Sequence, residues 1–137
     1  DPQRIGYLRF LSVVLSYFPT DPTYTADAGR WAEAFRWLRD EYEDRYPRLF
    51  ADIDFKSHPD SRPYSPQVSE FLTRIQLGNV VEVMNPGYAR LRIRKEAQQS
   101  TLDQHLRRMD VEVSALAKKM ADDLLTRRRD LLVLGER

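Results

Sequence analysis

The spacing of apolar residues predicts two helices in the first third of the chain. Residues 4–18 place apolar side chains on nearly every side of a helix, which is typical of a helix buried in a core. A second helix is expected to begin after Asp27, whose carboxylate can cap it, and to end near Tyr46, because Pro47 restricts the residue before it. An aromatic stripe along this helix indicates a core face rather than a ligand cage. Its members are Trp31, Phe35, Leu38 and Tyr42.

A third helix is predicted between Ser65 and Gly78. Ser65 suits the N-cap because its hydroxyl can accept a hydrogen bond from a backbone N–H of the first turn. Pro66 suits the first helical position, where its missing N–H costs nothing. Gly78 is expected to end the helix in the left-handed conformation. Apolar residues recur at helical spacing and form one face: Val68, Phe71, Leu72 and Ile75, with Leu77 as a further candidate.

Two short strands are expected after this helix. The β-branched run 80–84 favours a strand, and Asn85 to Tyr88 fits a type II turn with Gly87 at the position of positive φ. The return strand alternates, with Ala89, Leu91 and Ile93 on one face and Arg90, Arg92 and Arg94 on the other. A helix followed by such a hairpin predicts a winged-helix-like core with a small β-hairpin wing. The alternating residues 51–56 are expected to add a third strand beside the wing.

The C-terminal third predicts one long amphipathic helix. Its apolar residues recur in steps of three and four, as in a coiled-coil seam: Leu102, Leu106, Met109, Val113, Leu116, Met120 and Leu124. A helix from Leu102 to Leu132 would be about 46 Å long, which exceeds the width of a small domain. Dimerisation through this seam is the preferred interpretation, and a helix folded back across its own domain is the alternative. The predicted fold is therefore α+β and mainly helical, with a winged-helix-like domain at residues 1–95 and a long C-terminal helix at residues 96–137.

Composition is that of one folded domain. The chain has 137 residues, of which 42% are hydrophobic, and it has no cysteine. Disulfides and thiolate chemistry are excluded, and we predict a cytoplasmic protein. The apolar run from Ile5 to Phe18 is too short to span a bilayer and lacks a small-residue cleavage site. We therefore interpret it as a core helix and expect no membrane association.

Positive charge is concentrated after the turn of the predicted wing. Residues 88–137 hold 12 Lys and Arg against 8 Asp and Glu, a net +4, whereas residues 1–87 hold 10 against 13, a net −3. In a nucleic-acid-binding protein, Arg90, Arg92, Arg94 and Lys95 would contact phosphates. Gln67, Thr73 and Arg74 on the preceding helix are further candidate contacts. The alternative is a solvated strand face that pairs with nearby carboxylates such as Glu82.

No pattern of catalytic residues occurs in the sequence. The two histidines, His58 and His105, have no neighbours spaced as in a catalytic triad or a zinc site, and there is no glycine-rich phosphate loop. The oxygen-rich segment from Asp52 to Asp60 matches no metal-binding motif. We predict a non-enzymatic protein without a metal, cofactor or small-molecule substrate.

The tract from Pro63 to Tyr88 resembles one in prokaryotic winged-helix-like regulatory proteins, including the Panacea-type antitoxins. The residues that carry the resemblance are Pro63, Tyr64, Ser65, Pro66, Gly78, Val80 and the turn from Asn85 to Tyr88. The resemblance implies a winged-helix fold and a regulatory role. We predict a winged-helix regulatory protein that binds DNA through its basic wing, as a dimer. The alternative is a protein-interaction module that binds a helical partner through the C-terminal helix.

Overall fold

The computed structural model describes residues 5–84, 87–108 and 111–135. They form an α+β fold that is mainly helical, as predicted. The helices are α1 (Tyr7–Leu15), α2 (Ala28–Tyr42), the 3-10 helix η2 (Pro47–Leu49), α3 (Pro66–Leu77), α4 (Lys95–Arg108), α5 (Val111–Arg127) and α6 (Arg129–Leu132). The strands are β1 (Thr23–Thr25), β2 (Lys56–His58), β3 (Ser61–Tyr64), β4 (Val81–Met84), β5 (Arg90–Ile93) and β6 (Val133–Gly135).

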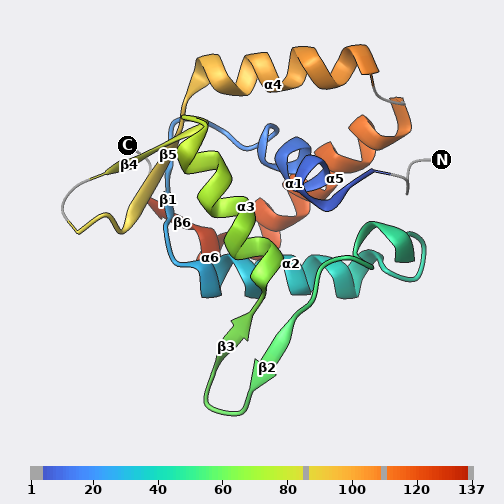
Figure 1. Ribbon diagram of the computed structural model, residues 1–137, viewed down its shortest axis with the longest axis vertical. Coiled ribbons are helices and arrows are strands. Elements are labelled where there is room, and N and C mark those ends of the chain that lie inside the picture. The colour runs from blue at the N-terminus through green and yellow to red at the C-terminus, as the bar shows by residue number, and fades with distance from the viewer. Residues whose placement is uncertain (1–4, 85–86, 109–110, 136–137) are drawn as a thin grey trace.

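A four-stranded antiparallel sheet in the order β4-β5-β1-β6 lies at one end of the molecule (Figure 1). The predicted hairpin is present, with Val81 opposite Ile93 and Met84 opposite Arg90. Gly87 has the expected positive φ of 75°, while Asn85 and Pro86 of the predicted turn lie outside the described residues. Strand β1 lies beside β5 and is only three residues long, too short for an alternating pattern to be recognised.

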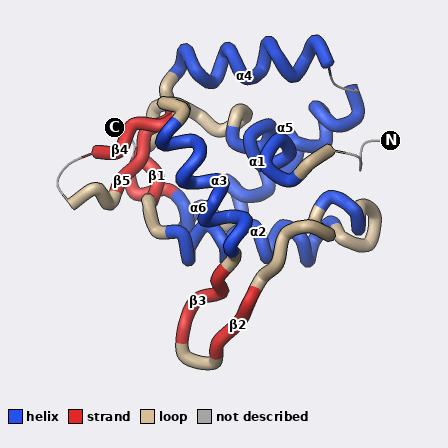
Figure 2. The backbone as a smooth tube through the Cα atoms, viewed as in Figure 1, coloured by secondary structure: helices blue, strands red, loops and turns tan. Residues whose placement is uncertain are grey.

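The prediction of a strand at residues 51–56 is wrong. Only Lys56 belongs to a strand, and that strand, β2, pairs with β3 in a separate hairpin that projects from the body (Figure 2). Residues 51–55 belong to no β-sheet, and side-chain contacts fix their position instead. Ile53 is buried, and Phe55 lies under the guanidinium of Arg39. The alternation therefore reflects isolated contacts with the core.

Both predicted N-caps are confirmed. Helix α3 ends at Leu77 with Gly78 as its C-cap residue, as predicted, but the left-handed conformation predicted for Gly78 is wrong, and Leu77 is exposed instead of joining the apolar face. The Val68 N–H donates to Ser65 Oγ at 3.2 Å, and the Gly29 N–H donates to Asp27 Oδ1 at 2.8 Å. Gly78 is not left-handed, because its φ is −83°. The left-handed residue is Asn79, with φ 58°, a residue type that tolerates this conformation because its short side chain can bond locally.

The core is centred on α1 and an aromatic cluster beside it. Trp31 of α2 stacks on Phe18 with 6.0 Å between ring centroids and contacts Phe35 at 5.9 Å. Its indole N–H donates to the carbonyl oxygen of Thr25 at 2.7 Å. The aromatic stripe predicted for α2 is thus a core face, and it joins α2 to strand β1.

The prediction of one continuous C-terminal helix is wrong. The structure describes two helices, and the chain reverses direction between α4 and α5, so that α5 lies against α1 (Figure 1). Three residues of the predicted seam, Val113, Met120 and Leu124, are buried in the core of their own chain. Leu102 and Leu116 are half-buried, whereas Met109 and the side chain of Leu106 lie outside the described residues. Fold-back across the chain's own core, the alternative to a dimer, accounts for this seam.

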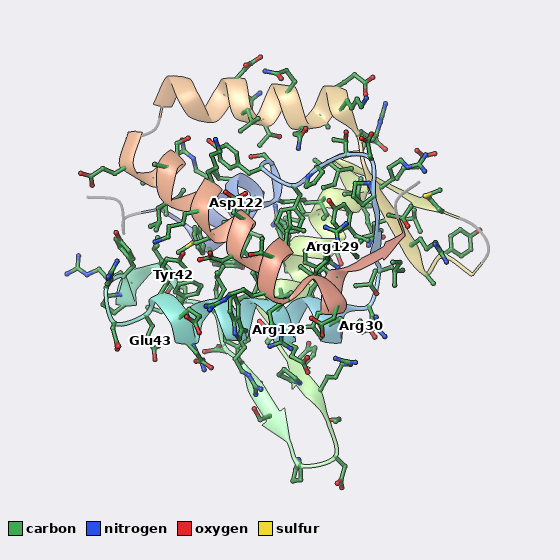
Figure 3. All side chains as sticks on the ribbon, turned by 180° about the vertical axis from the view of Figure 1, so that it is seen from behind. Arg30, Tyr42, Glu43, Asp122, Arg128 and Arg129 are labelled. Carbon is green, nitrogen blue, oxygen red and sulfur yellow. The ribbon has the colours of Figure 1, made fainter. Side chains whose placement is uncertain are left out.

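Polar contacts tie the C-terminal segment to α2. The Tyr42 hydroxyl donates to Asp123 Oδ2 on α5, and Arg128 Nη2 donates to Glu33 Oε2 at 3.4 Å. Figure 3 labels Tyr42 and Arg128, which belong to these two contacts. The segment after residue 95 therefore shares both a core and a sheet with the residues before it. Along the described part of the chain, no helix has the combination of length and apolar character that crossing a membrane requires.

Stability is expected to fall as the pH rises above about 10. Burial raises the pKa of Tyr24, and burial together with the hydrogen bond to Asp123 raises that of Tyr42. Above the ordinary tyrosine pKa, the unfolded chain loses protons that the folded chain keeps, so the free energy of unfolding decreases. Urea denaturation at a series of alkaline pH values should show a shallower decrease for Tyr24→Phe than for the parent. Tyr64→Phe, at an exposed tyrosine, is the control, and equal slopes in all three proteins would contradict the assignment.

Candidate nucleic-acid interface

The predicted arginine row lies on the face of the sheet that points away from the core. Leu91 and Ile93 of β5 are buried, so the strand's alternation directs Arg90 and Arg92 to the opposite face. Arg90 is exposed and Arg92 is half-buried. Arg94 follows the strand directly and is also exposed. The sequence pattern predicted this placement.

An open groove of about 550 Å³ runs beside the end of β5. Its lining combines β4, the end of β5, the start of α4 and the loop before β1: Glu82, Arg92, Ile93, Arg94, Lys95, Glu96, Thr20 and Asp21. The structure therefore brings three of the four predicted basic residues into one groove. The lining also holds three carboxylates, so the groove is mixed in charge rather than uniformly positive.

The arginines of the row are not neutralised by ion pairs within the described part of the chain. Arg90 Nη1 lies 3.5 Å from Thr23 Oγ1, and Arg94 Nη1 lies 3.5 Å from the Asn79 carbonyl oxygen, both weak contacts with neutral groups. Arg92 stands opposite Glu82 in the strand register, yet no salt bridge joins them. The predicted alternative, a face paired with carboxylates such as Glu82, therefore has no ion pair to support it among these residues.

Arg92 has an additional feature. Its Nε atom is buried and has no hydrogen-bond partner among the described residues. A buried donor without a partner is costly, and such groups in folded proteins usually have a functional or solvent-related reason.

The three candidates on α3 do not line this groove, and their polar groups are engaged elsewhere. Gln67 Oε1 accepts from the Asp54 N–H at 2.9 Å, which fixes the irregular segment before β2. Thr73 Oγ1 donates to the carbonyl oxygen of Ser69. Arg74 is paired with Glu70 at 3.3 Å. Gln67 therefore has a structural role, and its contact with nucleic acid stays a prediction.

Glu70 is held in its charged form beside Arg74. The hydrogen bond donated by the Tyr7 hydroxyl at 2.5 Å lowers the pKa of Glu70, burial opposes this, and the Arg74 charge adds to the lowering. The positive charge of Arg74 is consequently balanced on the helix itself.

Sequence reasoning missed the contribution of Thr20 and Asp21 to the groove. These residues precede β1 and reach the groove because β1 pairs with β5. No local pattern marks them, since their position depends on a contact between residues about seventy positions apart in the chain. Comparison with protein-family models, with curated proteins and with solved structures finds no match for this chain.

Proposed function

We propose that this chain is a winged-helix-like protein that binds nucleic acid through the arginine row of its wing. The observation that carries the proposal is the row itself: Arg90, Arg92 and Arg94 follow strand β5 on the side away from the core, with no carboxylate partner among the described residues. Guanidinium groups in this state suit phosphate oxygens, which accept bidentate hydrogen bonds.

The order of elements supports the winged-helix part of the proposal. Helix α1, strand β1, helices α2 and α3, and the hairpin β4-β5 follow one another along the chain, and β1 adds to the hairpin as a third strand. A helix followed by a two-stranded wing is the arrangement that the sequence resemblance implies. The β2-β3 hairpin is an addition between α2 and α3. Fold-level likeness alone does not determine function, so the unpaired arginines remain the main support.

Dimerisation through the C-terminal seam is not included in this function. Val113, Met120 and Leu124 are buried by α1, α2 and α6 of the same chain, so they are not available to a partner in this fold. The same burial weakens the alternative of a protein-interaction module that binds through that helix. A regulatory role, a cytoplasmic location and the lack of enzymatic activity stay predictions from the sequence.

The test is fluorescence anisotropy of labelled oligonucleotides titrated with the protein at low and near-physiological salt. Replacing Arg90, Arg92 and Arg94 together with alanine is expected to weaken binding by about 10- to 100-fold. Because three phosphate contacts would be lost, the slope of log K against log salt should fall in magnitude by about 2 to 3. Circular dichroism verifies that the variant stays folded.

A matched control removes the same charge from another surface. Arg36, Arg45 and Arg48 lie on α2, on the segment that follows it and on η2, and none of them lines the groove. Their triple alanine variant has the same net charge as the wing variant, so it should bind like the parent at each salt concentration. Equal binding by the wing variant and the parent would refute the proposal. Equal losses in both triple variants would show that net charge, not the row, drives binding.

A further inference from the structure

The tip of the wing carries an exposed aromatic side chain in an unusual backbone conformation. Tyr88 is 67% exposed and has a φ of 53°. A bulky residue with positive φ is an outlier, and such residues cluster at functional sites. No hydrogen bond or ring contact of Tyr88 is found among the described residues. Packing within the described fold therefore does not account for a large aromatic side chain here.

Tyr88 lies directly before the arginine row. It precedes Arg90 by two residues, and Arg90 pairs with Met84 at the end of the hairpin where the turn joins the two strands. A flat aromatic surface consequently stands at one end of a line of guanidinium groups. Proteins that bind single-stranded nucleic acid combine these two features, a positively charged track for the backbone and an aromatic platform on which a base stacks.

Recognition of duplex DNA by α3 has less support. A helix that reads base edges in the major groove needs free polar side chains on its outer face. On α3, Gln67 is bonded to the Asp54 backbone and Arg74 is paired with Glu70.

We infer that the ligand of the wing is single-stranded nucleic acid, with Tyr88 stacking on an unpaired base while Arg90, Arg92 and Arg94 contact the adjoining phosphates. This inference rests on the proposed function and specifies its substrate class. The bases of a duplex are stacked on one another, so their faces are not available to Tyr88. In a single strand, stacking on the ring adds binding free energy that does not depend on sequence.

The experiment compares a labelled oligothymidylate of about 12 nucleotides, an oligouridylate of the same length and a duplex of the same length. Tyr88→Asn removes the ring but keeps a residue that tolerates positive φ, so the turn is preserved. We expect the single strands to bind more tightly than the duplex. We expect Tyr88→Asn to bind them about 5- to 150-fold more weakly than the parent does. Tyr64→Asn, at an exposed tyrosine of β3, is the matched control and should bind like the parent.

A second variant reports stacking directly. Tyr88→Trp should bind the single strands at least as well as the parent, and its added fluorescence should be quenched on binding, because the indole would lie against a base. Tighter binding of the duplex, or unchanged single-strand binding by Tyr88→Asn, would overturn this inference while leaving the proposed function in place. If the parent protein bound none of the single strands or the duplex, the proposed function itself would be refuted.

Discussion

Replacing Leu124 with alanine is expected to destabilise the folded chain by about 2–5 kcal/mol, the usual cost of a leucine-to-alanine change in a core. Leu124 has no exposed surface, and α5 packs against α1, α2 and α6. The substitution leaves a cavity that the surrounding helices fill only in part. Urea or guanidinium denaturation of the monomer measures the loss as a lower midpoint with an unchanged slope.

The same substitution separates the two interpretations of the C-terminal seam. If α5 is part of the core, Leu124→Ala lowers stability at every protein concentration. If the seam held two chains together, stability would depend on protein concentration, and the substitution would shift the oligomeric state. Leu116→Ala, at a half-buried position of the same helix, is the control and should cost less. If the denaturation midpoint of the parent protein rose with protein concentration, this would contradict the burial of the α5 residues within their own chain.

Trp31→Ala is expected to cost about 3–5 kcal/mol, the range for removing a large aromatic side chain from a core. Trp31 is 1% exposed and contacts Phe18, Tyr24 and Phe35. Its loss would also leave the Thr25 carbonyl oxygen without the hydrogen bond from the indole. Because Thr25 belongs to β1, both the helical core and the sheet should weaken.

Trp31→Phe divides this effect into two parts. Phenylalanine keeps most of the apolar surface but cannot donate a hydrogen bond to the Thr25 carbonyl oxygen. Trp31→Phe should therefore lower the free energy of unfolding by less than Trp31→Ala does, and the remaining loss should reflect the unsatisfied carbonyl oxygen. Trp37→Phe, a half-buried tryptophan on the same helix, is the matched control and should lie close to the parent. Thermal denaturation followed by circular dichroism measures all three variants. Equal stability of Trp31→Ala and the parent would contradict the central role of the cluster.

Local features of the fold could be predicted from the sequence. Ser65 and Asp27 could be predicted as N-caps because a short polar side chain directly before a helix usually accepts a hydrogen bond from a backbone N–H of the first turn. The alternation of Leu91 and Ile93 with arginines determined both the hairpin and the side of the sheet that faces solvent. Each of these predictions depends on residues within a few positions of one another.

Features that depend on distant contacts could not be predicted. The apolar period of residues 113–124 shows that one face is buried, but it does not show which surface buries it. Strands β1 and β6 are three residues long and carry no readable alternation. The same distinction applies to the candidate site. The placement of the arginines on one face follows from the alternation of side chains along strand β5. The hydrogen bond of Gln67 to the Asp54 backbone and the ion pair of Arg74 with Glu70 depend on side-chain geometry, which the spacing of residues does not reveal.

The pairing of β6 with β1 has a consequence for the order of folding. Thr23 lies opposite Gly135, so one neighbour of β1 comes from the far end of the described chain. During synthesis β1 must wait for almost every later residue before the sheet can be completed. Contacts of such long sequence separation slow folding. We expect the nascent chain to keep an open sheet edge, with its risk of pairing with other chains, until translation has passed residue 135.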